Sequence, residues 1–488
     1  MKAEPSTMDI DPEEFRRLGR MAIDWISDYL AEIDGYPVLS RVRPGEIRQQ
    51  LGDHPPEDEE GLDQILADFQ KTIIPGITHW NHPAFFAYFP ITGSGAGILG
   101  ELFSAALNVN GMLWRTSPAA TELEETVLAW LREMLGLPSS LWGIIYDSAS
   151  MSTFHALAAA RQIAGGSTMR TAGIQNRDRP LRLYTSEQAH SSVQKAALAL
   201  GLGLDNVQLI PVDRHYRMGV SELRTAVQRD RDGGFQPMAV VATIGTTSTT
   251  SIDPVPEIGA FCRDSGIWLH VDAAYGGSAA VVPEMRWVLD GCELADSIVV
   301  NPHKWLFTPI DISVLYTNNP RVLKETFSLE AHYLQTSEGE TGTNYMDYGL
   351  SLGRRFRALK LWFVLRYFGR RGLANRLRKH MEWARQLAER IDSHPNFERL
   401  APVPFSTVCF RLNPKSRSLP PALLDDLNER LIGTINASGQ CYLSHTRLEG
   451  RFVLRMAIGN LRTQFHHIDQ AWETIQREAR RLLTEVAS

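Results

Sequence analysis

The sequence predicts an α/β protein built on a mostly parallel sheet with helices on both faces. Between about residues 90 and 370, short apolar strands alternate with helical segments, which is the pattern of parallel βαβ units. The expected strands are 142–146, 181–184, 238–243, 267–271 and 297–300, and the expected helices between them are 152–161, 191–200 and 257–264. Ligands of such sheets bind at the carboxyl ends of the strands.

Helical segments are expected on both sides of this region. Asp11 and Pro12 are typical of a helix start, and apolar residues recur at helical spacing from Phe15 to Tyr29. The Pro- and Gly-rich stretch 37–56 is expected to be an irregular connection before a second helix at about 62–72. The expected C-terminal elements are helices at 354–368, 375–391, 421–434 and 469–485, and strands at 407–412 and 452–458.

These segments predict three parts. Residues 1–90 form an N-terminal helical segment that has too little core to stand alone, so we expect it to pack on a partner subunit. Residues 91–370 form a large α/β domain that carries the functional site, and residues 371–488 form a small C-terminal α+β domain.

Composition narrows the class of protein. The 488 residues carry a net charge of −6 with scattered Lys and Arg, which argues against a nucleic-acid partner. The four cysteines are far apart and are expected to be buried thiols in a reducing compartment, not a disulfide framework or a zinc site: Cys262, Cys292, Cys409 and Cys441. The N-terminus lacks the layout of a signal peptide, and no apolar run reaches the ~20 residues of a membrane span, so we expect a cytoplasmic protein.

Two ionisable residues follow strands of the predicted sheet. Asp272 directly follows the strand 267–271, and Lys304 comes shortly after the strand 297–300. A pyridoxal phosphate site needs this pair, because a carboxylate keeps the pyridine nitrogen protonated and a lysine amine forms an imine with the cofactor. The alternative is a plain salt bridge between two strand ends.

Three more strand ends carry small or polar residues. Ala149 and Ser150 follow the strand 142–146 at a helix start, where free backbone N–H groups can hold a phosphate, or where a serine simply caps the helix. His190 follows the strand 181–184 and could stack on a flat ring, although a lone histidine is more often structural. Thr247 follows the strand 238–243 and could supply a hydroxyl. Together with Asp272 and Lys304, these residues favour the cofactor hypothesis.

One motif points elsewhere. Residues 95–100 read GAGILG, which matches the GxGxxG pattern of dinucleotide-binding loops. No clean strand precedes it, and the segment about 20 residues later, where that fold places an acid on a second strand, is predicted to be helical. The dinucleotide interpretation is therefore rejected.

The chain resembles the group II pyridoxal-phosphate decarboxylases, specifically the aromatic-L-amino-acid decarboxylases. The resemblance rests on HWNHPAFFAYFP (79–90), TSPAATELE (116–124), DSAS (147–150), EQAHSSV (187–193), WLHVDAAYGGSA (268–279), ADSIVVNPHKW (295–305) and LGRRFRALKLWFVLR (352–366). It covers roughly residues 10–480 in family order, and HVDAAY together with NPHKW is highly specific. It implies the aspartate-aminotransferase-like fold (fold type I) and an obligate homodimer whose N-terminal helices embrace the partner and whose active sites lie at the interface.

The resemblance also implies a role for each matching residue. Lys304 would bind the cofactor covalently, Asp272 would pair with the pyridinium nitrogen, and His190 would stack on the ring near the scissile carboxylate. Tyr333 or His190 would return the proton to Cα after CO₂ leaves. The phosphate end would be held by Ala149, Ser150, Asn301 and His303, with Thr247 as a further cofactor contact. The substrate pocket would be lined by Trp80, Tyr88, Phe89 and Pro90, with Met112 contributed by the partner subunit.

Three positions bear on the reaction and its substrate. Tyr333 precedes a Gly-, Ser- and Thr-rich segment that is typical of a mobile loop; in the family this tyrosine returns the proton after CO₂ leaves, and relatives with Phe there tend toward aldehyde formation. Taken alone, Tyr333 could be an exposed loop aromatic. Ile91 stands where catechol-using relatives often carry Thr, and Gly353 leaves room for a ring as large as indole.

The expected function is therefore that of a carboxy-lyase that converts an aromatic L-amino acid to the arylalkylamine and CO₂. The first alternative is an oxygen-consuming aldehyde synthase that uses the same cofactor. The second is a cofactor-free binding or scaffold protein, which the presence of Asp272, His190, Lys304 and Tyr333 disfavours.

Overall fold

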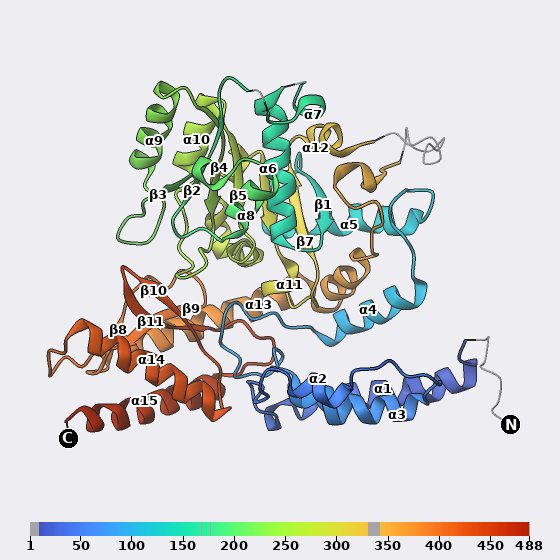
Figure 1. Ribbon diagram of the computed structural model, residues 1–488, viewed down its shortest axis with the longest axis vertical. Helices are drawn as coiled ribbons and strands as arrows, with labels where there is room; N and C mark the ends of the chain where they lie inside the picture. Colours follow the sequence, from blue (N-terminus) through green and yellow to red (C-terminus); the bar gives the residue numbers. More distant parts are fainter. Residues whose placement is uncertain (1–8, 167, 176, 330–341, 488) are drawn as a thin grey trace.

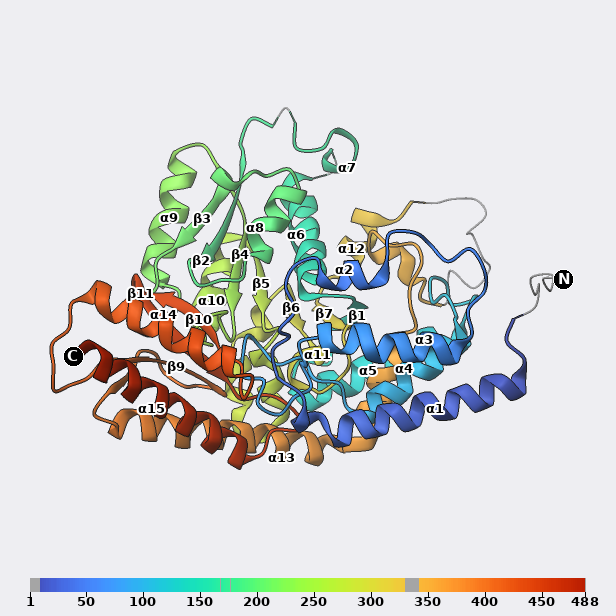
Figure 2. The same cartoon turned by 60° about the horizontal axis from the view of Figure 1, so that its bottom comes forward.

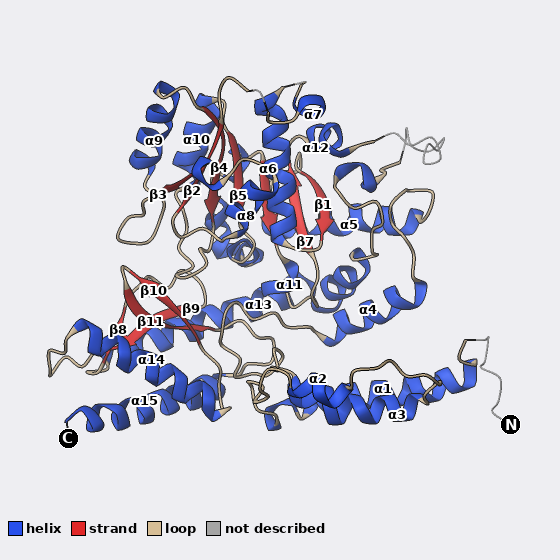
Figure 3. Cartoon of the chain, in the orientation of Figure 1, coloured by secondary structure: helices blue, strands red, loops and turns tan. Residues whose placement is uncertain are grey.

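The computed structural model describes residues 9–166, 168–175, 177–329 and 342–487. Its strands form a seven-stranded sheet and a separate four-stranded sheet, which Figure 3 shows as two groups of arrows. Within these described ranges, no helix is both long and apolar enough to cross a membrane.

The seven-stranded sheet organises the large domain. Its strands are β1 (Trp142–Tyr146), β2 (Leu181–Ser186), β3 (Val207–Ile210), β4 (Gln236–Thr243), β5 (Trp268–Asp272), β6 (Ser297–Val300) and β7 (Ser313–Thr317), in the order β1-β7-β6-β5-β4-β2-β3. The strands from β3 to β6 pair in parallel, whereas β7 runs antiparallel to both β6 and β1. The prediction of a mostly parallel sheet is confirmed.

Helices cover both faces of this sheet (Figure 1). The helices of the large domain are α4 (Gly95–Leu107), α5 (Pro118–Leu135), α6 (Ala149–Gly165), α7 (Met169–Ala172), α8 (Ser192–Ala199), α9 (Val220–Asp232), α10 (Val255–Ser265), α11 (Pro302–Trp305) and α12 (Pro320–Phe327). Successive strand residues point to opposite faces, so Ile144 belongs to the core that contains Leu157 of α6, and Ile145 belongs to the core that contains Leu128 of α5.

The small C-terminal domain has its own sheet and core. Strands β8 (Phe397–Arg399), β9 (Thr407–Leu412), β10 (Ser444–Leu448) and β11 (Arg451–Ala457) pair antiparallel in the order β10-β11-β9-β8. Helices α14 (Pro421–Ser438) and α15 (Phe465–Ala487) pack on it, and the long α13 (Ala358–Ser393), interrupted at Gly369, connects it to the large domain.

The N-terminal helices lie along one side of the molecule. Helix α1 (Pro12–Ala31) begins as predicted, because the Asp11 side chain accepts a hydrogen bond from the backbone N–H of Glu13. Helix α3 (Leu62–Asp68) lies beside α1, to which the Arg17–Asp63 ion pair joins it, and both lie away from the seven-stranded sheet in Figure 1. Helix α2 (Glu46–Leu51) is separated from α1, as Figure 2 shows.

Three expectations about elements need correction. The stretch 37–56 is not wholly irregular, because Gly45 and Gly52, both with positive φ, flank the six-residue α2. The helix expected from residue 354 begins only at Ala358, because Arg354 leaves the helical path to pair with Glu124. The second helix ends at Asp68 and continues as a single wider turn, Phe69–Ile73.

The glycines of the GAGILG motif serve helix packing. They lie in the first turns of α4, and α4 packs on α13. A Cβ atom on Gly100 would stand 2.7 Å from Lys360 Cα, which is too close for any side chain. The rejection of a dinucleotide loop at these residues is consistent with this geometry.

Candidate active site

A cavity of about 430 Å³ lies at the carboxyl ends of the central strands, which is within the usual size of small-molecule sites. It is lined by Trp80, Tyr88, Phe89, Ile91, Ser148, Ala149, Ser150, His190, Thr243, Gly245, Thr247, Ser248, Asp272, Ala274, Tyr275, Asn301, His303, Lys304, Ser444, His445, Thr446 and Arg455. The described residues contain no group of His, Cys, Asp or Glu side chains suited to a metal ion, and all four cysteines are buried free thiols.

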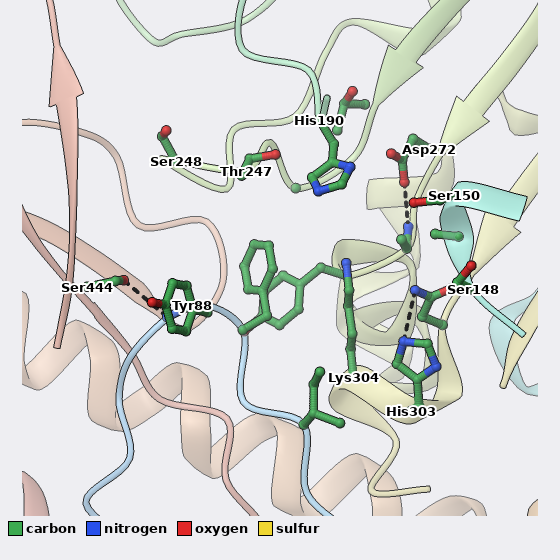
Figure 4. Close-up of a pocket in the computed structure, with 18 of the residues that line it drawn as sticks. Tyr88, Ser148, Ser150, His190, Thr247, Ser248, Asp272, His303, Lys304 and Ser444 are labelled. Carbon is green, nitrogen blue, oxygen red and sulfur yellow. Dashed lines mark hydrogen bonds between the residues drawn. The ribbon is translucent and has the colours of Figure 1, made fainter. Parts of the chain in front are cut away.

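Asp272 and Lys304 both line this cavity (Figure 4). Asp272 is the last residue of β5, and Lys304 lies on α11, which follows the adjacent parallel strand β6. The Asp272 carboxylate accepts a hydrogen bond of 3.1 Å from the backbone N–H of Ala274, which fixes its direction. Burial lowers the pKa of the Lys304 amine, while the Asp272 carboxylate opposes that shift and the Arg455 guanidinium adds to it. A lowered pKa favours the neutral amine that can attack a carbonyl.

The residues expected at the phosphate end lie together on one side of the cavity. Ala149 and Ser150 form the N-terminus of α6, whose cap is Ser148. Asn301 Nδ2 lies 3.3 Å from His303 Nε2, and His303 Nδ1 accepts a hydrogen bond from the backbone N–H of Ile312. Burial lowers the pKa of His303 to about 3, so this imidazole is neutral at physiological pH.

His190 and Thr247 lie on the other side, above Lys304 in Figure 4. His190 Nδ1 accepts a hydrogen bond of 3.1 Å from the backbone N–H of Ser192, so Nε2 is the nitrogen left for a ligand. Burial lowers the pKa of His190 below its ordinary value. The imidazole is therefore uncharged at neutral pH and suited to stacking on a flat ring.

Buried polar atoms of the cavity lining lack a hydrogen-bond partner among the described residues. These atoms are Asn301 Oδ1 and Thr243 Oγ1, and a third such atom is Arg455 Nη2. Buried polar groups are normally satisfied, so a cavity with such atoms beside Lys304 and Asp272 fits a polar, planar cofactor such as pyridoxal phosphate.

Aromatic side chains form the remaining wall. Trp80 and Tyr88 stack with ring centroids 5.8 Å apart, and Phe89 stacks on Tyr275 at 4.0 Å. Lys304 Nζ lies 5.1 Å from the centroid of the Phe89 ring. A flat apolar side chain would find most of its contacts here.

The structure does not bring every expected residue to this cavity. Pro90 is buried and does not line the cavity, although its neighbours Phe89 and Ile91 do. Met112 and Gly353 do not line the cavity of a single chain. Tyr333 lies outside the described residues.

Sequence reasoning missed the contribution of the C-terminal sheet. Ser444, His445 and Thr446 of β10 and Arg455 of β11 line the cavity. One signal was available: Arg455 interrupts the apolar run FVLRMA (452–457) of an otherwise buried strand. A charge at such a position is costly unless it has a specific partner.

Known proteins match the chain over almost its full length. A family model described as "Pyridoxal-dependent decarboxylase conserved domain" matches residues 44–413. Phenylacetaldehyde synthase of Arabidopsis thaliana is 40% identical over 484 residues, which are 97% of each chain. Tryptophan decarboxylase TDC1 of Camptotheca acuminata is 40% identical over 490 residues, 98% of this chain and 96% of that one. Tyrosine decarboxylase 4 of Petroselinum crispum is 40% identical over 488 residues, 98% of this chain and 95% of that one.

Solved structures agree with these matches. The Oryza sativa TDC structure with PLP and tryptamine has a TM-score of 0.94 and 35% identity, and the match covers 98% of this chain and 100% of that one. Catharanthus roseus tryptophan decarboxylase in complex with L-tryptophan has a TM-score of 0.91 and 37% identity, covering 97% and 100% of the two chains. The expected fold is confirmed.

Proposed function

Because the chain belongs to the pyridoxal-dependent decarboxylases, we propose that it converts an aromatic L-amino acid to the corresponding arylalkylamine and CO₂. The cofactor is pyridoxal 5′-phosphate. The observation that carries the proposal is the cavity in which Lys304 and Asp272 lie beside the aromatic wall of Trp80, Tyr88 and Phe89.

Pyridoxal phosphate supplies an electron sink for the bond that breaks at the substrate Cα. In the proposed mechanism, Lys304 would bind the cofactor covalently and Asp272 would hold a proton on its ring nitrogen. His190 would stack on the ring, and Asn301, His303 and the α6 N-terminus at Ala149 and Ser150 would hold the phosphate, with a hydroxyl contact from Thr247. Trp80, Tyr88 and Phe89 bind the aromatic side chain and exclude water from the reacting carboxylate.

The decisive experiment is a CO₂-release assay on tryptophan, tyrosine, phenylalanine and dihydroxyphenylalanine with added cofactor. The proposal expects release from at least one of the four and its loss in Lys304→Ala. It also expects the purified protein to be yellow and to lose that colour in the same variant. A colourless protein that ignores added cofactor and all four amino acids would instead favour the scaffold alternative.

An aldehyde synthase is the second candidate, because phenylacetaldehyde synthases of Arabidopsis thaliana and of a Rosa hybrid cultivar are as similar to this chain as the decarboxylases are. Tyr333 favours decarboxylation, because a phenol at this position can return a proton to Cα. The test measures oxygen uptake, ammonia and peroxide alongside CO₂. We expect the wild type to release amine without oxygen uptake, and Tyr333→Phe to shift its products toward aldehyde.

We also propose that the enzyme is a homodimer with shared active sites. Met112 and Gly353, which do not line the cavity of their own chain, would then act in the partner's site. The apolar surface of α4 supports this arrangement, because Leu99, Leu102, Phe103 and Leu107 are each 44–59% exposed.

A further inference from the structure

The backbone of Tyr88 adopts a conformation that a tyrosine rarely takes. Its φ is +51°, in the left-handed region that favours glycine. Tyr88 lines the cavity, where its side chain is half exposed and stacks on Trp80. Backbone strain of this kind persists only where the surrounding structure holds it.

Three residues of the C-terminal domain hold Tyr88. Its backbone N–H donates a hydrogen bond of 3.1 Å to Ser444 Oγ, which Figure 4 marks, and its carbonyl oxygen accepts one from Arg455 Nη1. Its hydroxyl lies 3.1 Å from that of Tyr442. Ser444 on β10 and Arg455 on β11 are direct partners in the antiparallel register. The paired residues Ser444 and Arg455 therefore bind the backbone N–H and the backbone carbonyl of Tyr88.

Arg455 also contacts the cofactor side of the cavity. Its Nε donates a hydrogen bond of 2.9 Å to the carbonyl oxygen of Ser248, the residue after Thr247, and its guanidinium lies 4.5 Å from the centroid of the Phe89 ring. Arg455 is 3% exposed, and no carboxylate in the described part of the chain forms a salt bridge with it. A buried cation without a counter-ion is expensive, so stability alone does not explain its presence.

We propose that Ser444 and Arg455 are positioning residues that fix Tyr88 and Phe89 in the geometry that receives the aromatic side chain of the substrate. The planar guanidinium can reach two carbonyl groups at once, which a lysine ammonium cannot do with the same geometry. Arg455 thus connects the substrate wall at Tyr88 to the loop that carries Thr247. This inference rests on the proposed function only for the identity of the ligand.

The test uses four single variants of the full-length holoenzyme. Ser444→Ala removes one hydrogen bond, Ser444→Thr keeps the hydroxyl, and Arg455→Lys keeps the charge but loses the planar geometry. Arg451→Met is the control, because it removes a guanidinium from the same strand where Arg451 forms a salt bridge with the exposed Glu449. Thermal melting verifies that each variant folds.

The first readout does not depend on activity. Amide hydrogen exchange of peptides spanning residues 85–90 should speed up about 3- to 10-fold in Ser444→Ala, because the Tyr88 N–H loses its acceptor. Exchange in Ser444→Thr and Arg451→Met should match the wild type. Unchanged exchange in Ser444→Ala would overturn the proposal.

The second readout separates positioning from direct contact with the substrate carboxylate. KM should rise about 3- to 10-fold in Ser444→Ala and about 10- to 100-fold in Arg455→Lys, with a smaller change in kcat, and Ser444→Thr should restore it. The inhibition constant of the product amine, which has no carboxylate, should rise by the same factor as KM. If binding of the amine is unaffected while that of the amino acid weakens, Arg455 binds the carboxylate and the proposal is wrong.

The two proposals fail in different ways. If none of the four aromatic amino acids reacts, the proposed function fails, while the exchange measurement still decides whether Ser444 holds Tyr88. If decarboxylation is normal but Ser444→Ala changes neither exchange nor KM, only the positioning role fails.

Discussion

Asp272 lies at the end of a buried strand and is 6% exposed. Replacing it with Asn keeps the shape of the side chain and an acceptor for the Ala274 N–H, but removes the negative charge that would hold a proton on the cofactor ring. We expect Asp272→Asn to release CO₂ about 10²- to 10⁴-fold more slowly at saturating cofactor. Asp296→Asn is a matched control, because Asp296 accepts a backbone N–H from Leu269 at the opposite end of the same strand. Equal activity of the two variants would contradict the assigned role.

At the level of residues, the sequence predicts the cavity residues at the strand ends of the large domain better than those that the C-terminal domain contributes. Asp272, Lys304 and His190 follow strands of one parallel sheet, and the topology of such sheets brings these ends together. Ser444 and Arg455 could not be placed in the same way. Their approach to Tyr88 depends on how the C-terminal domain docks on the rest of the chain, and no local periodicity records that contact.

At the level of elements, a buried ion pair explains two of the sequence motifs. Glu124 of α5, in TSPAATELE, pairs with Arg354, in LGRR, at 2.8 Å, and both side chains are at most 10% exposed. Glu124 Oε1 also accepts the backbone N–H of Ile145 on β1. The Glu124–Arg354 pair therefore connects the segment before α13 to β1, the strand that precedes the N-terminus of α6.

Removing one partner of this pair leaves a buried charge without compensation. We expect Glu124→Gln to lower the free energy of unfolding by about 3–5 kcal/mol. Glu133→Gln, at an exposed position of the same helix, should change it by less than about 0.5 kcal/mol. Denaturant titration of both variants measures the difference, and similar midpoints would show that the pair contributes little to stability.

The exposed apolar face of α4 gives a test of the proposed dimer. A lysine at Leu102 would place a charge in the buried interface, so Leu102→Lys should be monomeric and lose most of its activity. Leu198→Lys changes an equally exposed leucine of α8 and should leave the assembly intact. Light scattering after size exclusion should give twice 54.7 kDa for the wild type; a fully active wild-type monomer would exclude shared sites.

Some short elements were predictable from the sequence, and others were not. The strands β1 and β6 were expected at the residues where they occur, and α1 begins at its expected cap. Strand β7 was missed, because a five-residue apolar run fits a buried helix as well as a strand. The six residues of α2 are too few to show helical periodicity, and only the flanking glycines mark it.

At the level of the whole molecule, buried histidines predict the pH dependence of stability. Four of them outside the cavity have a pKa lowered by burial, to about 4 for His82, His155 and His270 and to about 3 for His380. The unfolded chain binds protons on these residues below about pH 6.5, whereas the folded chain does not. Stability should therefore fall as the pH drops from about 6.5 toward 4.

The loss should reach roughly 2 kcal/mol per histidine by pH 5. Burial raises the pKa of Asp253 to about 6, so this carboxyl binds a proton more readily in the folded state and partly offsets the loss. Denaturant titrations at pH 5 and pH 7 measure the net effect. The difference in the free energy of unfolding between pH 7 and pH 5 should be smaller in His270→Asn. An equal free energy of unfolding at both pH values would contradict the lowered pKa values of these histidines.

Trp305 directly follows Lys304, the residue proposed to carry the cofactor. Its indole ring stacks on Tyr275, with ring centroids 4.8 Å apart. An indole on the residue next to a lysine that carries a chromophore absorbing in the near ultraviolet would transfer its excitation instead of emitting light. Loading of the apoenzyme should therefore dim its tryptophan fluorescence, and Trp305→Phe should weaken that quenching. The intensity of tryptophan fluorescence should therefore measure the fraction of active sites that contain the cofactor.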